Sequence, residues 1–319
     1  MTFRILVVAA MFVSYARPAE TGIRGSILGF VFDPAHGVQP IFGIAGAATI
    51  GPPLKLGAQI TGLATSSQQN YALAKTASDS NFVRIDFGEP GALLPLGVPA
   101  PAAGLAVVSP MGSAAAFYDR ERNRILVIRG LPDAAAVASD VDVTGFPEVI
   151  SLAVNDSADA VLFAFADAEM AARVDDRFVS LGLRGTAMRF LSASREAVIA
   201  DAAASTVYLL KNLAGAPEVT VLADSIPEPV AVASSSDNKR VFVASSVSGT
   251  VTGIELASGG VTVTSCACRP STLADLNGNA IFRLTEPSGS PLWVFDADAP
   301  EPRIVFVPPY RSVTESEAQ

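Results

Sequence analysis

Two cysteines and one histidine have the most distinctive chemistry in this 319-residue chain. Cys266 and Cys268 are one residue apart, so both thiols would point to the same side of an extended segment. In an oxidising compartment they can pair as a disulfide, and as thiolates they can bind a soft metal with ligands from elsewhere. Two thiolates leave a tetrahedral site half empty, and carboxylates suit a soft metal poorly. We therefore expect a structural pair, disulfide or semi-buried thiols, and no metal site.

The single histidine offers little for catalysis. Any Ser-His-Asp site would have to be built on His36, which lies beside Gly37 in a sequence typical of a hairpin turn. Turns lie on the surface, so an exposed histidine is the simpler interpretation. No nucleophile elbow, phosphate-binding loop or dinucleotide-binding motif occurs in a strand-to-helix context. The sequence contains no constellation that we can name as catalytic.

A short segment, residues 275–279 (Asp-Leu-Asn-Gly-Asn), places oxygen atoms at calcium-like spacing. It lacks the closing glutamate of a calcium-binding loop, and turns use Asp and Asn for their own backbone hydrogen bonds. We therefore predict a turn at this segment, and we predict no cofactor for the chain.

The elements that must position these residues are short apolar strands that recur along the chain. Residues 105–130 hold the clearest unit: a strand, a Ser-Pro-Met-Gly turn, a second strand, a polar loop and a third strand. Matching first strands begin near residues 149, 187, 230 and 272, a spacing of roughly 37 to 45 residues. Their Val, Ile and Phe content is typical of strands, and the spacing is that of four-stranded propeller blades.

The repeats predict an all-β fold, a β-propeller of seven four-stranded blades built from six full repeats and an N-terminal half blade. Residues 27–44 supply the half blade, which we interpret as the third and fourth strands of a unit whose first two are missing. The alternatives are a six-bladed ring and a solenoid of stacked repeats. We expect residues 17–310 to form this single domain and residues 311–319 to form a loose polar tail.

The order of these segments resembles YVTN-type and lactonase-like β-propeller repeats. Residues 107–113 (Val-Val-Ser-Pro-Met-Gly-Ser) are the closest match, and residues 231–244 are a second. Residues 24–44 are similar to the opening of uncharacterised secreted propellers. The resemblance covers nearly the whole mature chain, with a degenerate repeat. It implies an architecture and no activity, because propellers host many unrelated functions and no catalytic motif of the family stands in this sequence.

A propeller brings two kinds of loop to one face: the links from one blade to the next, and the loops between second and third strands. Charged residues of those loops in this chain are Glu148, Arg184, Glu228, Arg269, Asp119, Arg120, Asp167 and Glu169. A ring of charges around the mouth of a central channel can bind a ligand or a partner. We therefore predict a binding face there.

The composition limits the classes of partner. The net charge is -9 and the sequence pI is near 4.7, which argues against a general nucleic-acid binder and against docking on anionic lipid. The leading hypothesis is a non-catalytic binding or scaffold protein, monomeric, whose charged face takes an unknown protein or small ligand. The competing class is a lactonase-like or other hydrolase with a divalent metal held by acidic loops. The missing acid–base or nucleophile constellation weighs against that class.

Residues 1–16 resemble a secretory signal peptide. Arg4 supplies the positive charge, residues 5–13 the apolar run, and residues 14–16 (Ser-Tyr-Ala) the small residues that a signal peptidase reads. The run is shorter than the roughly 20 residues that span a bilayer as a helix. The alternative is a buried N-terminal strand. We expect a secreted or periplasmic protein without a transmembrane segment.

Export predicts that the mature chain begins at Arg17, because cleavage after Ala16 follows the small residues of the signal. N-terminal sequencing of the protein recovered outside the cytoplasm checks this. A recovered chain that still begins at Met1 would contradict the prediction.

Overall fold

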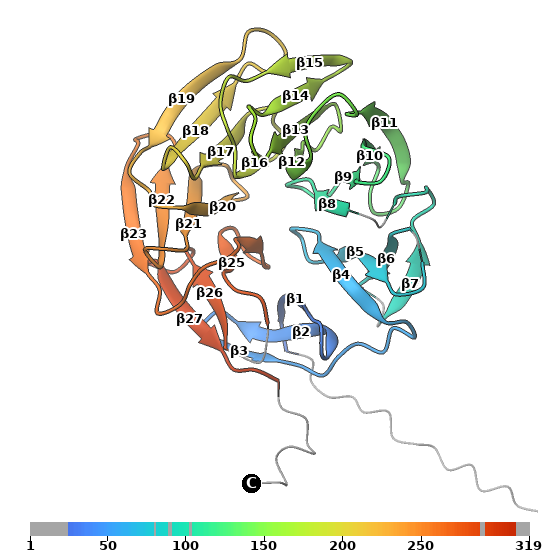
Figure 1. The fold of residues 1–319 in the computed structure, drawn as a ribbon. Helices are drawn as coiled ribbons and strands as arrows, with labels where there is room; N and C mark the ends of the chain where they lie inside the picture. The colour runs from blue at the N-terminus through green and yellow to red at the C-terminus, as the bar shows by residue number, and fades with distance from the viewer. Residues whose placement is uncertain (1–24, 80, 89–90, 102–103, 288–290, 311–319) are drawn as a thin grey trace, which may run out of the picture.

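Seven small antiparallel sheets surround a central channel in the computed structural model (Figure 1). The model describes residues 25–310, apart from 80, 89–90, 102–103 and 288–290. Six sheets have four strands and one, the N-terminal sheet, has three. The seven-bladed, all-β propeller is therefore confirmed.

Blades are numbered here from the N-terminal sheet. Blade 1 contains β1 (Ile27–Asp33), β2 (Gly37–Ile44) and β3 (Ala47–Ile50). Blade 2 contains β4 (Ile60–Thr65), β5 (Tyr71–Thr76), β6 (Val83–Asp86) and β7 (Ala92–Pro95). Blade 3 contains β8 (Gly104–Val108), β9 (Ala114–Asp119), β10 (Arg124–Arg129) and β11 (Ala136–Asp142). Blade 4 contains β12 (Val149–Val154), β13 (Ala160–Phe165), β14 (Ala171–Val174) and β15 (Arg177–Ser180).

The remaining blades repeat the same order. Blade 5 contains β16 (Ala187–Phe190), β17 (Ala197–Asp201), β18 (Thr206–Lys211) and β19 (Glu218–Ala223). Blade 6 contains β20 (Pro229–Ser234), β21 (Arg240–Ser245), β22 (Thr250–Glu255) and β23 (Val261–Ser265). Blade 7 contains β24 (Ala274–Asp275), β25 (Ile281–Arg283), β26 (Leu292–Asp296) and β27 (Arg303–Val307).

Burial changes in a regular way from the channel to the rim. The second strands β9 and β13 are buried at every position, because neighbouring blades cover both faces of the sheet. Such strands are continuous apolar runs, with no alternation of apolar and polar residues. The fourth strands, such as β19 and β23, are mostly exposed. The core is therefore a set of apolar layers between blades.

Blade 1 corrects one detail of the prediction. β1 is buried along most of its length like a second strand, and β3 is half exposed like a fourth strand. Asp33 at the end of β1 accepts a hydrogen bond from the Ala35 N–H, as Asp119 and Asp201 do for the loops that follow β9 and β17. The interpretation of residues 27–44 as third and fourth strands is wrong: they are the second and third. The apolar runs of these two positions are similar in composition, so the hairpin sequence alone does not assign them.

The first-strand position of blade 1 holds no strand within the described residues, and side chains bond to the backbone of β1 there. Gln69 Oε1 accepts from the Phe30 N–H at 2.8 Å, and its Nε2 donates to the Asp275 carbonyl at 2.8 Å. The Asn277 backbone N–H donates to the Leu28 carbonyl at 2.7 Å, and its side-chain Nδ2 donates to the Ile27 carbonyl at 2.9 Å. A Cβ at Gly29 would come within 2.5 Å of the Leu276 side chain, so glycine permits this approach. Gln69 thus joins blades 1, 2 and 7.

Pro40 lies in the middle strand of blade 1, where a proline removes a ladder hydrogen bond. Its carbonyl accepts from the Gly51 N–H, but it has no N–H to return. The buried Gln39 side chain donates to the Gly51 carbonyl at 3.0 Å and makes the missing bond.

No helix among the described residues is long and apolar enough to cross a membrane. The predicted signal peptide at residues 1–16 and the predicted tail at residues 311–319 lie outside the described residues.

Gln69→Leu should destabilise the ring. The substitution leaves the buried Phe30 N–H without its acceptor, and one buried group of this kind costs about 1–3 kcal/mol. The urea midpoint should fall, with the circular dichroism of the folded protein unchanged. Gln68→Leu is the matched control, because Gln68 is exposed. Equal midpoints for the two variants would show that Gln69 does not close the ring.

Candidate ligand-binding site at the channel mouth

The loops that join first and second strands meet at one face of the ring, and we call them the mouth loops. They are residues 66–70, 109–113, 155–159, 191–196, 235–239 and 276–280. Several begin with a small polar residue that holds the turn. Ser109 Oγ accepts from the Ala114 N–H at 3.0 Å, and Asn155 Oδ1 accepts from the Ala160 N–H at 3.0 Å. Short polar side chains of this kind favour turns by bonding nearby backbone.

Each mouth loop is hydrogen-bonded to its neighbours, and together these bonds form what we call the mouth belt. Asp156 of blade 4 accepts from Met111 N of blade 3 at 2.7 Å and from Ala193 N of blade 5 at 2.8 Å. Tyr71 of blade 2 donates its hydroxyl to the Gly112 carbonyl of blade 3 at 2.6 Å. Burial raises the pKa of Tyr71, so the phenol stays protonated and keeps this bond.

The belt continues through blades 5, 6 and 7. Asn238 of blade 6 accepts from the Ser192 N–H and donates to the Ser192 carbonyl, both at 2.8 Å. Ser236 Oγ donates to Asn279 Oδ1 of blade 7 at 2.7 Å. Gln69 and Asn277 bond to β1 and complete the circuit. The mouth is therefore held in place by directed bonds all the way round.

An ion pair strengthens the belt between blades 4 and 5. Arg195 Nη2 lies 2.7 Å from Asp159 Oδ2 and 3.0 Å from Asp175 Oδ1. Burial acts to raise the pKa of Asp159, but hydrogen bonds from Arg195 and Asn155 outweigh it, and the pKa is lowered from its ordinary value. The carboxylate is therefore stabilised in its charged form.

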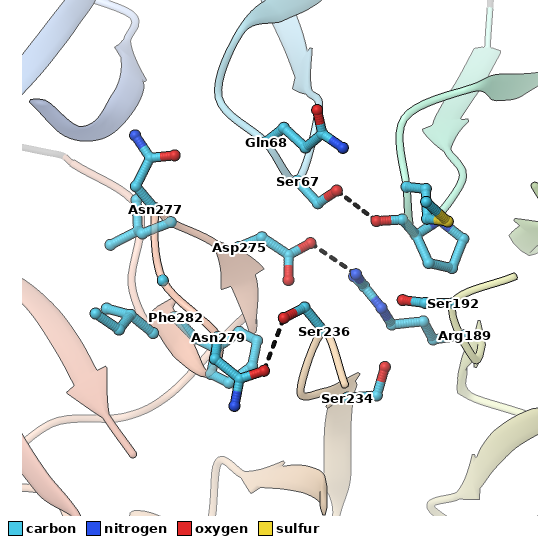
Figure 2. Close-up of a pocket in the computed structure, with 15 residues that line it drawn as sticks. Ser67, Gln68, Arg189, Ser192, Ser234, Ser236, Asp275, Asn277, Asn279 and Phe282 are labelled. Carbon is cyan, nitrogen blue, oxygen red and sulfur yellow. Dashed lines mark hydrogen bonds and ion pairs between the residues drawn. The ribbon is translucent and has the colours of Figure 1, made fainter. Parts of the chain in front are cut away.

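The belt encloses a cavity of about 350 Å³ (Figure 2). Five blades line this cavity, and blade 3 does so through Pro110 and Met111. Apolar side chains make up much of the lining, and its hydroxyls and amides belong to Ser67, Gln68, Ser192, Ser234, Ser236, Asn277 and Asn279. A second cavity of about 330 Å³ runs along the first strands inside the channel. Four residues line both cavities and therefore lie at the boundary between them: Ser67, Pro110, Arg189 and Asp275.

Two contacts join residues at this boundary, and both are drawn as dashed lines in Figure 2. Arg189 Nη2 of β16 lies 2.8 Å from Asp275 Oδ2 of β24, and each side chain is 20% exposed. Ser67 Oγ donates to the Pro110 carbonyl. Arg189 and Asp275 come from blades 5 and 7, so the ion pair joins two blades that are not neighbours in the ring.

Two buried polar atoms at this site lack a hydrogen-bond partner among the described residues. They are Arg189 Nε and the hydroxyl of Ser234, a residue that is only 5% exposed. Buried polar atoms are almost always paired in native proteins, so each unpaired one calls for a partner. Together with the open cavity, they indicate a site with unused hydrogen-bonding capacity.

The charged face predicted from the sequence lies at the opposite end of the channel, and none of its residues lines these two cavities. Arg120 pairs with Glu148 at 2.6 Å, with both side chains more than half exposed. Asp119 is buried and accepts from Glu121 N and Arg122 N, so it shapes its own turn. Glu228 accepts from Ser246 Oγ at 3.2 Å. The others are exposed: Arg184, Arg269, Asp167 and Glu169.

The residues with distinctive chemistry lie elsewhere. Cys266 and Cys268 form a disulfide in the link between blades 6 and 7, with Cα atoms 5.0 Å apart. His36 lies 3.2 Å from Asp33 in the β1–β2 turn. Within the segment 275–279, Asp275 ends β24 and the other residues belong to the loop that follows. The side chains bond to different partners, Asp275 to Arg189 and Asn277 to β1. Among the described residues, no group of three or more His, Cys, Asp or Glu side chains could hold a metal ion.

Sequence reasoning missed the mouth because its central residues carry weak signals. Arg189 is the one charge in a short apolar strand, and Asp275 stood out only for its calcium-like spacing. The usable signal was the position of the polar turns, because all of them follow first strands and must meet at one end of a ring.

Comparison with known proteins supports the fold. A functionally unknown protein from Desulfotomaculum acetoxidans is 13% identical with a TM-score of 0.60, over 89% of this chain and 100% of that one. A protein from Lactobacillus plantarum is 14% identical with a TM-score of 0.57, over 88% and 96%. A catalytically inactive virginiamycin B lyase from Staphylococcus aureus, solved with quinupristin, is 12% identical with a TM-score of 0.55, over 80% and 85%.

The likeness is one of fold. No protein-family model and no curated protein matches the sequence. The comparisons therefore support a propeller and do not confirm the narrower YVTN and lactonase-like resemblance.

The Asp159–Arg195 pair predicts a pH-dependent stability. The pKa of Asp159 is lower in the folded chain than the ordinary 3.8, so its contribution is present above that pH and is lost as pH falls through the lowered value. The difference in unfolding free energy between wild type and Asp159→Asn should be constant near neutral pH and shrink in acid. In an Arg195→Gln background most of this pH dependence should vanish. A difference that stays constant through the acid range would contradict the assignment.

Proposed function

We propose that this protein is an exported, non-catalytic binding protein that holds a small polar ligand at the channel mouth. One observation carries the proposal: five blades line one cavity that combines hydroxyls and amides, apolar side chains and an ion pair. Cavities of a few hundred Å³ with a small number of placed polar groups are typical of small-molecule sites.

The mouth belt supports this role because it fixes the lining before any ligand arrives. Ser192, Ser236 and Asn279 line the cavity and are also bonded to their neighbours in the belt. A site with an ordered lining loses little conformational entropy on binding, which favours affinity. A small ligand therefore meets groups that are already in position.

The wider features of the proposal rest on the sequence. Export rests on the signal pattern at residues 1–16, and the YVTN and lactonase-like resemblance rests on the repeat. The virginiamycin B lyase structure contains quinupristin, so a propeller of similar fold accommodates a small molecule. We further propose that the opposite face, with the exposed Arg120–Glu148 pair, is the surface available to a protein partner.

Met111→Trp should block the site. Met111 lines the cavity and is 47% exposed, so an indole there covers the mouth without disturbing the core. Small polar compounds that raise the melting temperature of the wild type should lose that effect in Met111→Trp. Phe178→Trp is the matched control, because Phe178 is 48% exposed on the outer strand β15.

The same compounds should still stabilise Arg120→Ala with Glu148→Ala, since that pair lies on the opposite face. If Met111→Trp keeps the stabilisation and the double alanine variant loses it, the ligand site is on the opposite face and the proposal fails. A broad panel without any stabilising compound would also contradict it.

A further inference from the structure

We infer that the ligand of the mouth cavity is a small zwitterion, of the class of free amino acids and short peptides. Its carboxylate would bind Arg189 and its ammonium group would bind Asp275. This inference rests on the proposed function and specifies the substrate class of the same site.

The charges of the cavity carry the argument. Among the described residues that line it, Arg189 and Asp275 are the only charged ones, one of each sign. Each is four-fifths buried, so an unpaired charge at either position is costly. A ligand with only a carboxylate would take Arg189 and leave Asp275 without a partner, and an amine would do the reverse. A zwitterion replaces one ion pair with two.

The geometry leaves both groups with capacity to bind. Asp275 approaches the guanidinium at Nη2, while Nε is buried without a partner in the described part of the chain. A guanidinium has five N–H donors in a planar fork that matches a carboxylate. An incoming carboxylate that takes two of these donors would replace the contact of Arg189 with Asp275.

The surroundings suit the rest of such a ligand. The cavity of about 350 Å³ has room for an amino acid or a dipeptide. Gln68 and Asn279 offer side-chain amides, and the unpartnered Ser234 hydroxyl offers both a donor and an acceptor. Figure 2 shows the Ser234 hydroxyl on the same side of the site as Arg189 and Ser236. These groups match the amide and carbonyl of a peptide bond.

Isothermal titration calorimetry on the full chain tests the inference with probes matched in size. Glycylglycine and the standard free amino acids are the zwitterions, N-acetylglycine carries only the carboxylate, glycinamide carries only the ammonium group, and glycerol carries neither. At least one zwitterion should bind about tenfold or more tightly than each of the other three. Arg189→Gln and Asp275→Asn should each lower the affinity for that zwitterion by a similar factor.

The single-charge probes give a reciprocal test. Asp275→Asn should bind N-acetylglycine more tightly than the wild type, because Arg189 then has no competing carboxylate. Arg189→Gln should gain affinity for glycinamide for the same reason. Arg124→Gln, which breaks the exposed Arg124–Asp140 pair on the outer strands of blade 3, is the control and should change none of these affinities. The melting temperature of each variant shows that it is folded.

Failure of this inference is distinct from failure of the proposed function. If N-acetylglycine, glycinamide or glycerol binds as tightly as every zwitterion, or if no zwitterion binds, the ligand class is wrong. Met111→Trp would still abolish stabilisation by other compounds if the mouth binds a different class. The site itself would be disproved only if Met111→Trp were still stabilised by the compounds that stabilise the wild type.

Discussion

The mouth belt is the interaction on which the rest of the structure depends. Each blade is a separate sheet, and apolar layers hold the blades together. Apolar packing is strong but non-directional, so it does not by itself fix how one blade is set against the next. The belt adds directional bonds: Asp156 bonds the loops on both of its sides, Asn238 bonds the loop of blade 5, and Asn279 bonds the loop of blade 6. The position of every cavity-lining loop follows from these bonds.

Ring closure uses the same chemistry at its weakest point. Blade 1 has three strands in the described part of the chain, so no strand covers the inner edge of β1 there. An open strand edge presents unpaired backbone groups. Gln69 and Asn277 bond to that edge from the two flanking blades, and Gln69 also reaches the Asp275 backbone. Asp275, which binds the ligand's ammonium group in our proposal, is therefore bonded through its backbone to Gln69, which also bonds to β1.

The sequence predicts the scaffold better than the site, for physical reasons. Second strands such as β13 are continuous apolar runs because both of their faces are buried, and that pattern is visible in the residues. The strand positions of blade 1 were misassigned because burial and the Asp33 turn, which composition does not reveal, distinguish a second strand from a third. The mouth site depends on Arg189 and Asp275 meeting from blades 5 and 7, which only the curvature of the ring brings about. Charge density favoured the opposite face, where Asp119 is buried within its own turn.

Hydrogen–deuterium exchange of the purified chain, with and without a bound small zwitterion, tests the central claim that the mouth is the binding surface. The account predicts slower backbone exchange in four of the mouth loops, residues 66–70, 191–196, 235–239 and 276–280, because the ligand contacts side chains that these loops hold. Exchange in the loops of the opposite face, including residues 119–123 and 265–269, should stay the same. Slower exchange in those opposite loops, with the mouth loops unchanged, would contradict the account.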